Sequence, residues 1–153
     1  MRKQLTIALV AHDNRKADLV EWAVFNADFL AKHKLVCTGT TGSMVLNAFK
    51  NKGVDADVTC MNSGPLGGDA EIAALVVRKQ VDLAVFLIDD LNAQPHEADI
   101  QMLLRQCRVH NVPIACNRYS ADLMITSTLW DSDDYFPTEP KYVTFKRSKR
   151  RSK

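Results

Sequence analysis

Apolar, β-branched runs alternate with stretches of helical spacing along this chain, and that alternation restricts the possible folds more than any other feature. The apolar runs span residues 5–11, 34–39, 54–62, 81–89 and 112–117. The stretches of helical spacing follow them, at about 15–33, 42–50, 68–79, 98–110 and from Ser120 onward. Strands that alternate with helices pair in parallel through right-handed crossovers. The sequence therefore predicts an α/β fold, with three α/β/α layers around a doubly wound, five-stranded parallel sheet.

The central runs contain no polar position. The segments IALVA, LAVFLI and PIAC are apolar throughout, as expected of strands that helices cover on both faces. A chain of 153 residues suits one domain with a single core, and we expect that domain to cover residues 1–145. The last eight residues, 146–153, read KRSKRRSK and carry six bases and no acid. Such a tail can bind nucleic acid or a membrane surface, but we interpret it as a solvated, disordered end.

Composition argues against several classes of protein. Hydrophobic residues make up 46% of the chain and charged residues 25%, a balance typical of soluble globular proteins. No apolar run approaches the roughly 20 residues that cross a bilayer, and His12 and Asp13 interrupt the N-terminal run too early for a signal peptide. We therefore expect a cytoplasmic protein with no membrane partner. Aromatic and basic residues are not interleaved, so no nucleic-acid partner is expected either.

The four cysteines form no CxxC pair, which argues against a structural zinc site or a thioredoxin-type motif. Three of them, Cys37, Cys60 and Cys116, fall in apolar, strand-like runs. Free cysteine is commonly buried as a small apolar residue, and we expect that role here in preference to a catalytic thiol.

Polar and reactive side chains follow most of the predicted strands. Ligands bind at the carboxyl ends of the strands in open parallel sheets, so these residues are expected to meet at one edge. The groups that follow the first four strands are His12 with Asp13, the TGTTG segment at 38–42, the SGPLGGD segment at 63–69, and Asp89 with His96. The sequence therefore predicts a ligand site at this edge.

TGTTG has the composition of an anion-binding turn. Threonine hydroxyls donate hydrogen bonds, glycines let backbone N–H groups converge, and the helix that begins here contributes the positive end of its dipole. An ordinary capped Thr/Gly turn would look similar. The segment matches neither the phosphate loop of the Walker type nor the dinucleotide motif GxGxxG.

SGPLGGD repeats this arrangement one strand later and adds Asp69 at a helix start. Two such turns on neighbouring strands are expected to hold one phosphate from both sides. The helix N-terminus is expected to keep Asp69 ionised and able to accept a proton. An ordinary capping aspartate is the alternative interpretation. Lys16, in the first turn of the first helix, is a candidate point charge for the phosphate.

His96 lies between Asp89 and Asp99, which are expected to orient it and tune its pKa. As a neutral donor it could polarise a carbonyl group. A metal site is the competing possibility, with His12, Asp13, Asp89, His96 and Asp99 as ligands, although no tight ligand-spacing motif supports it.

Taken together, these motifs resemble the methylglyoxal synthase family from about residue 5 to residue 128. The resemblance is carried by IALVAHD at 7–13 with Lys16, TGTTG at 38–42, SGPLGGD at 63–69, and the run FLIDDLNAQPHEAD at 86–99. It implies a lyase that converts dihydroxyacetone phosphate to methylglyoxal and inorganic phosphate, a bypass of glycolysis. It also implies a homohexamer that needs no metal and no cofactor and that phosphate can inhibit.

The resemblance assigns roles to individual residues. It implies that Asp69 is the catalytic base, that His96 polarises the substrate carbonyl, and that Asp13, Asp89 and Asp99 are acids near that centre. It implies substrate binding by His12, Lys16, Thr38, Gly39, Thr40, Thr41, Ser63 and Gly64. Two alternatives stay open at this point. One is a non-catalytic sensor of phosphorylated effectors, like the regulatory modules of larger enzymes that are similar to this chain. The other is a metal-dependent lyase.

Overall fold

The computed structural model describes residues 4–133 and 140–142, and within them it contains a five-stranded parallel sheet with the order β3-β2-β1-β4-β5. The strands are β1 (Thr6–Ala11), β2 (Lys34–Thr38), β3 (Asp57–Met61), β4 (Leu83–Leu87) and β5 (Ile114–Ala115). In the register of the sheet, Leu9 of the central strand β1 pairs with Cys37 on one side and Val85 on the other. The predicted doubly wound, parallel α/β fold is confirmed.

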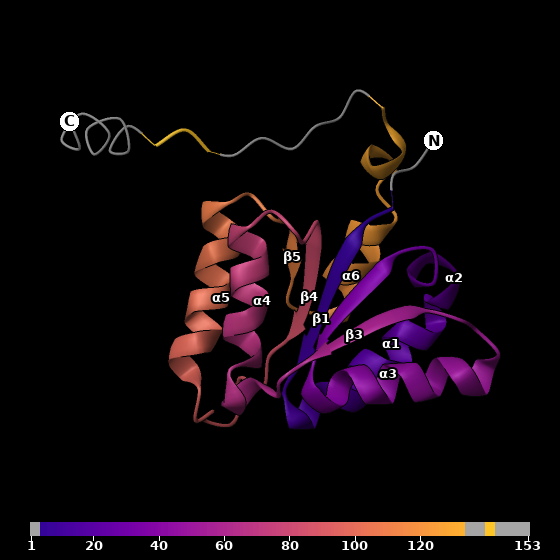
Figure 1. The fold of residues 1–153 in the computed structure, drawn as a ribbon, viewed down its shortest axis with the longest axis horizontal. Coiled ribbons are helices and arrows are strands. Elements are labelled where there is room, and N and C mark those ends of the chain that lie inside the picture. The colour runs from indigo at the N-terminus through magenta and orange to yellow at the C-terminus, as the bar shows by residue number, and fades with distance from the viewer. Residues whose placement is uncertain (1–3, 134–139, 143–153) are drawn as a thin grey trace.

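Helices cover both faces of this sheet. They are α1 (Lys16–Phe25), α2 (Ala27–Leu30), α3 (Gly39–Lys52), α4 (Gly68–Val77), α5 (Glu97–Val109) and α6 (Arg118–Ile125), with short 3-10 turns η1 (Asp13–Arg15), η2 (Gly64–Leu66) and η3 (Thr128–Asp131). Figure 1 shows α4 and α5 on one side of the sheet and α1, α3 and α6 on the other. Alternate residues of β1 serve the two cores: Leu9 packs with the α1–α3–α6 side, and Val10 with the α4–α5 side.

The helix predicted over 15–33 is two helices, because the chain breaks at Asn26 (φ −104°, ψ 23°). The Asn26 amide donates to the Trp22 carbonyl at 2.9 Å and so competes with the backbone ladder. The Trp22 indole donates to the Asp122 carboxylate of α6 at 2.8 Å, and the Asn26 amide approaches the same oxygen at 3.4 Å. The break between the two helices is therefore stabilised by Asp122, which lies almost a hundred positions away in the chain.

The expectation of buried cysteines is only half right. Cys37 and Cys107 are buried, and burial raises the pKa of the Cys37 thiol to about 12 and that of Cys107 to about 11. Cys60 and Cys116 are exposed. Cys60 lies on β3, an edge strand of the sheet that is less buried than its neighbour β2.

No helix among the residues that the structure describes is long and apolar enough to span a bilayer. The predicted basic tail at 146–153 lies outside the described residues.

Candidate active site

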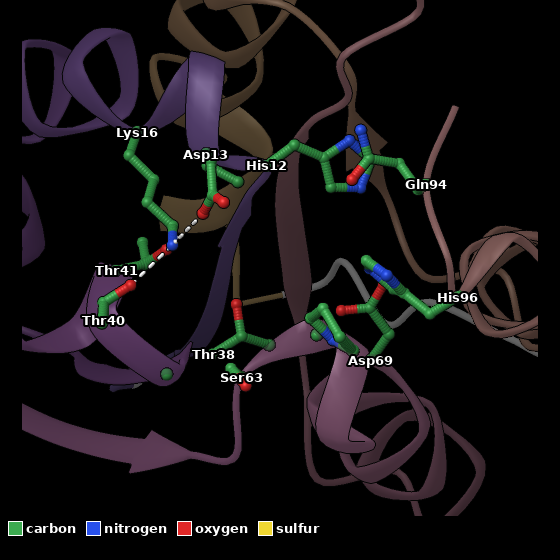
Figure 2. Close-up of a pocket in the computed structure, with 14 residues that line it drawn as sticks. His12, Asp13, Lys16, Thr38, Thr40, Thr41, Ser63, Asp69, Gln94 and His96 are labelled. Atoms are coloured by element: carbon green, nitrogen blue, oxygen red, sulfur yellow. Dashed lines mark hydrogen bonds and ion pairs between the residues drawn. The ribbon is translucent and has the colours of Figure 1, made fainter. Parts of the chain in front are cut away.

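A cavity of about 280 Å³ opens at the carboxyl edge of the sheet, which is a size suited to a small ligand. It is bounded by the ends of β1 and β2, the first turn of α3, the η2 turn, the start of α4 and the loop before α5 (Figure 2). Eleven of the thirteen predicted site residues line it: His12, Asp13, Lys16, Thr38, Gly39, Thr40, Thr41, Ser63, Gly64, Asp69 and His96. Segments far apart in the chain therefore converge as the strand-end argument expected.

One side of the cavity suits an anion. Thr38 is the N-cap of α3, which begins at Gly39, three residues earlier than predicted, so that most of TGTTG forms the first turn of the helix. The first N–H groups of a helix have no partner within it. That of Gly39 donates to the Asn62 carbonyl at 3.1 Å, while Thr40 and Thr41 follow it at the cavity wall.

The two predicted phosphate turns touch each other at Gly39. This residue has a φ of +38°, and a Cβ placed on it would lie 2.7 Å from the Cα atom of Ser63. Only glycine allows this backbone conformation at such a close approach. The Thr/Gly turn and the serine turn therefore form one continuous wall rather than two separate sites.

Lys16 supplies positive charge at the edge of this wall. Its Nζ donates to the Thr40 hydroxyl at 2.5 Å and forms an ion pair with Asp13 Oδ1 at 2.7 Å. The ammonium group lowers the pKa of the Asp13 carboxyl, through the hydrogen bond first and its charge second. Figure 2 shows the Lys16 side chain directed towards Thr40 and Thr41, where it is placed to bind an anion.

The opposite side of the cavity holds the carboxylate of Asp69. Asp69 lies in the first turn of α4, is 1% exposed, and neither of its oxygens accepts a hydrogen bond. Oδ2 lies 3.4 Å from Nε2 of His96, and both side chains are directed into the cavity in Figure 2. A carboxylate that is buried without partners is a group placed for chemistry rather than for stability.

Burial raises the pKa of Asp69, against a smaller lowering by His96, and Asp99 raises it further. The direction is opposite to the one expected from the helix N-terminus, because loss of water around the carboxylate outweighs the dipole. The helix N-terminus is therefore not the main influence on this pKa, and the ionised state of Asp69 stays a prediction. A raised pKa also makes the ionised form a stronger base.

His12 faces both catalytic candidates from the end of β1. Its ring lies 5.6 Å from that of His96, at 90°, and its buried Nε2 has no hydrogen-bond partner. Its Nδ1 accepts a hydrogen bond from the backbone N–H of Asp89 at 2.8 Å. Burial, followed by the neighbouring His96, lowers the pKa of His12, which favours the neutral imidazole.

The structure does not favour the metal interpretation. Ligand atoms of His12, Asp69 and His96 lie within 4.8 Å of one another. However, a neutral imidazole whose Nδ1 accepts a hydrogen bond carries its proton on Nε2, and that nitrogen then has no lone pair for a metal. A histidine that binds a metal instead donates its other N–H. The five-residue set considered from the sequence is not brought together in the described part of the chain, because only its two histidines belong to this group.

Asp89 and Asp99 are the two predicted site residues that do not line the cavity. The Asp89 carboxylate is occupied by Asn14, Asn92 and the N–H of Leu91. Gln94 also lines the cavity, although no motif in the sequence indicated it; its side-chain amide donates to the Asn92 carbonyl at 3.3 Å. The only sequence feature that could have indicated Gln94 is its position two residues before His96.

Comparison with known proteins agrees with this geometry. The family model described as MGS-like domain matches residues 18–116. A methylglyoxal synthase of Treponema socranskii is 69% identical over 147 residues, which cover 96% of this chain and 93% of that protein. The chain belongs to the methylglyoxal synthase family.

Other members of the family are more distant but equally complete. A methylglyoxal synthase of Coxiella burnetii (strain RSA 493 / Nine Mile phase I) is 44% identical and covers 92% of this chain and 94% of its own length. The crystal structure of methylglyoxal synthase from Elizabethkingia anophelis NUHP1 superposes with a TM-score of 0.82, at 37% identity, over 96% of this chain and 93% of that one. The predicted family and the prediction of an enzyme of this type are confirmed, and the sensor alternative is not favoured.

Proposed function

We propose that this chain eliminates phosphate from dihydroxyacetone phosphate to give methylglyoxal and inorganic phosphate, with Asp69 as the base. The observation that carries the proposal is the buried, unpartnered carboxylate of Asp69 facing the threonine-lined turn across one small cavity. A triose phosphate has an anionic end for the turn and a hydroxymethyl end for the carboxylate.

In the first step, Asp69 removes a proton from the hydroxymethyl carbon. The electron pair moves towards the carbonyl, whose oxygen becomes negatively charged as the enediolate forms. His96 is placed beside Asp69 to donate a hydrogen bond from Nε2 to that oxygen. Because the site is buried, such a donor acts in a low dielectric and stabilises the charge more than it would in water.

In the second step, the hydroxyl on the deprotonated carbon gives up its proton to water and becomes a carbonyl. The π electrons of the enediolate shift towards the carbon on the other side, which expels phosphate as its C–O bond breaks. This C–O bond breaks most easily when it stands perpendicular to the plane of the enediolate, where its antibonding orbital overlaps the π system. Lys16 and the wall formed by Thr40, Thr41 and Ser63 are proposed to hold the phosphate in that orientation and to stabilise its leaving charge. The released enol then tautomerises to methylglyoxal.

A discontinuous assay with dihydroxyacetone phosphate tests the proposal. The wild-type chain is expected to produce methylglyoxal and phosphate in equal amounts. Asp69→Asn is expected to abolish turnover while the fold and the binding of inorganic phosphate remain. Binding of the triose phosphate without any methylglyoxal would instead indicate a sensor. An Asp69→Asn variant that turns over at the wild-type rate would exclude Asp69 as the base.

We also propose a homohexamer in the cytoplasm, inhibited by inorganic phosphate. The family resemblance supports the assembly, and exposed apolar side chains such as Phe25, Leu66 and Leu91 are suited to subunit contacts. Light scattering should give about 103 kDa, six times the 17.1 kDa of one chain. Inhibition is expected because free phosphate competes for the wall that holds the substrate's phosphate, so it should raise KM.

A further inference from the structure

The hydrogen bond from Asp89 N–H to His12 Nδ1 decides which nitrogen of His12 carries the proton. A neutral imidazole has one N–H and one lone pair. The lone pair must lie on Nδ1 to accept this bond of 2.8 Å, so the proton lies on Nε2. Nε2 is buried, has no protein partner and lies on a side chain that lines the cavity. His12 therefore presents a donor, and not an acceptor, to whatever fills the site.

The position of this N–H depends on how the turn after β4 is held. Oδ2 of Asp89 accepts from the side-chain amides of Asn14 and Asn92, each at 2.9 Å, and Oδ1 accepts from the Leu91 N–H at 3.1 Å. Asn14 lies in η1, two residues beyond His12, whereas Asn92 lies in the loop that leads to His96. The Asp89 carboxylate thus links the turn after β4 to η1 on one side of the site and to the loop before His96 on the other. The Asn14 and Asn92 bonds are charge-assisted and lower the pKa of Asp89, which keeps it ionised.

We propose that Asn14 and Asn92 are positioning residues, which hold Asp89 so that its N–H keeps His12 in the Nε2–H form. His12 is then a second hydrogen-bond donor, beside His96, for the anionic oxygens of the substrate. The inference rests on the proposed function, because that function places the substrate against His12. The inference also gives a role to Asp89, whose side chain does not line the cavity.

The opposite tautomer would be harmful. With the proton on Nδ1, Nε2 would present a lone pair to the substrate, and a lone pair repels an enediolate or phosphate oxygen. An imidazolium would donate from both nitrogens but would then clash with the Asp89 N–H. The charged and titratable groups around His12 are His96, which opposes protonation, and Asp89, Glu97 and Asp13, which favour it. The carboxylate of Asp69 also faces it, with an oxygen within 4.8 Å of a ring nitrogen.

The test uses the full-length chain, labelled with ¹⁵N on histidine, and variants that remove the amides. Two-bond ¹H–¹⁵N correlation spectra distinguish the Nε2–H form, the Nδ1–H form and the imidazolium, and His12→Gln assigns the signals. In the wild type near neutral pH, His12 is expected as the Nε2–H form. In the double variant Asn14→Ala/Asn92→Ala, we expect a substantial population of Nδ1–H or imidazolium and a fall in kcat/KM of about tenfold or more.

Asn117→Ala is the matched control, because Asn117 accepts from the Ser120 N–H as the N-cap of α6 and does not line the cavity. This variant should lose stability yet keep both the His12 tautomer and the rate. A wild-type His12 in any form other than Nε2–H would overturn the inference. So would a double variant whose tautomer is unchanged, whether or not its activity falls. Absence of methylglyoxal formation by the wild type would instead count against the proposed function, and the spectra would still decide the tautomer.

Discussion

Substitution of Gly64 by alanine is expected to slow catalysis by about a hundredfold while leaving the fold intact. Gly64 begins η2 and lies beneath the two groups proposed to act on the substrate. A Cβ at this position would lie 2.6 Å from Nε2 of His96 and 3.2 Å from Oδ1 of Asp69. Gly64 is not among the glycines with positive φ, so alanine fits the backbone and the added methyl group acts only through what it touches.

The size of the effect follows from these distances. Ordinary van der Waals contact begins at 3.4 Å, so Nε2 of His96 must move by about 0.8 Å, and a misplacement of about 1 Å typically costs on the order of a hundredfold in rate. That corresponds to about 2.7 kcal/mol in activation free energy. The His96 side chain can turn aside at little cost in folding free energy, because it is the end of a side chain and not the backbone that meets the methyl group.

The assay compares kcat for dihydroxyacetone phosphate with the thermal midpoint of each variant. Gly53→Ala is the matched control, because Gly53 ends α3 in the left-handed conformation (φ +75°) with no atom within 4 Å of an added Cβ. It should lose about 1 kcal/mol of stability from backbone strain and keep its activity. A Gly64→Ala enzyme with wild-type kcat would show that neither His96 nor Asp69 is needed where the structure places it, and it would refute the reasoning.

Three further predictions concern charge and pH. Because the pKa of Asp69 is raised, kcat/KM should fall with decreasing pH above the ordinary aspartate range. Asp99→Asn removes a neighbouring negative charge and should move this acidic limb of the pH profile to lower pH; an unshifted limb would contradict the assignment. The pKa of His12 is lowered on folding, so the unfolded state binds more protons and the stability contributed by neutral His12 is lost as pH falls below about 6.5. Urea titrations of His12→Gln should therefore show a weaker loss of stability between about pH 7.5 and 5.5 than the wild type shows. Lys16→Ala should raise KM by about tenfold or more and weaken inhibition by phosphate, because it removes the cation beside Thr40; equal phosphate inhibition in both proteins would exclude Lys16 from the anion site.

The sequence predicted the architecture because that information is local. A strand buried on both faces must be apolar along its buried length. β4 is apolar throughout and β1 is apolar from Ile7 onward, so their place in the centre of a parallel sheet followed directly. Carboxyl ends of parallel strands share one edge, so the Thr/Gly turn, Asp69 and His96 could be expected to meet before any coordinates were known.

Other features could not be predicted because they depend on atoms that are distant in the chain. The break at Asn26 depends on Asp122, and the first turn of α3 depends on the Asn62 carbonyl that takes up the Gly39 N–H. Asp89 and Asp99 looked like members of the site because of their spacing around His96, yet hydrogen bonds made elsewhere occupy the Asp89 carboxylate.

The sequence by itself determined the fold and the edge of the sheet at which most of the candidate site residues lie. Only the tertiary structure decided their electrostatic state. Asp69 was expected to behave as an aspartate at a helix N-terminus, but several segments exclude water from it and its pKa rises instead. The proton of His12 is likewise placed by a backbone N–H 77 positions away. Desolvation and hydrogen-bond direction depend on the full three-dimensional surroundings of a group, which no local pattern of residues contains.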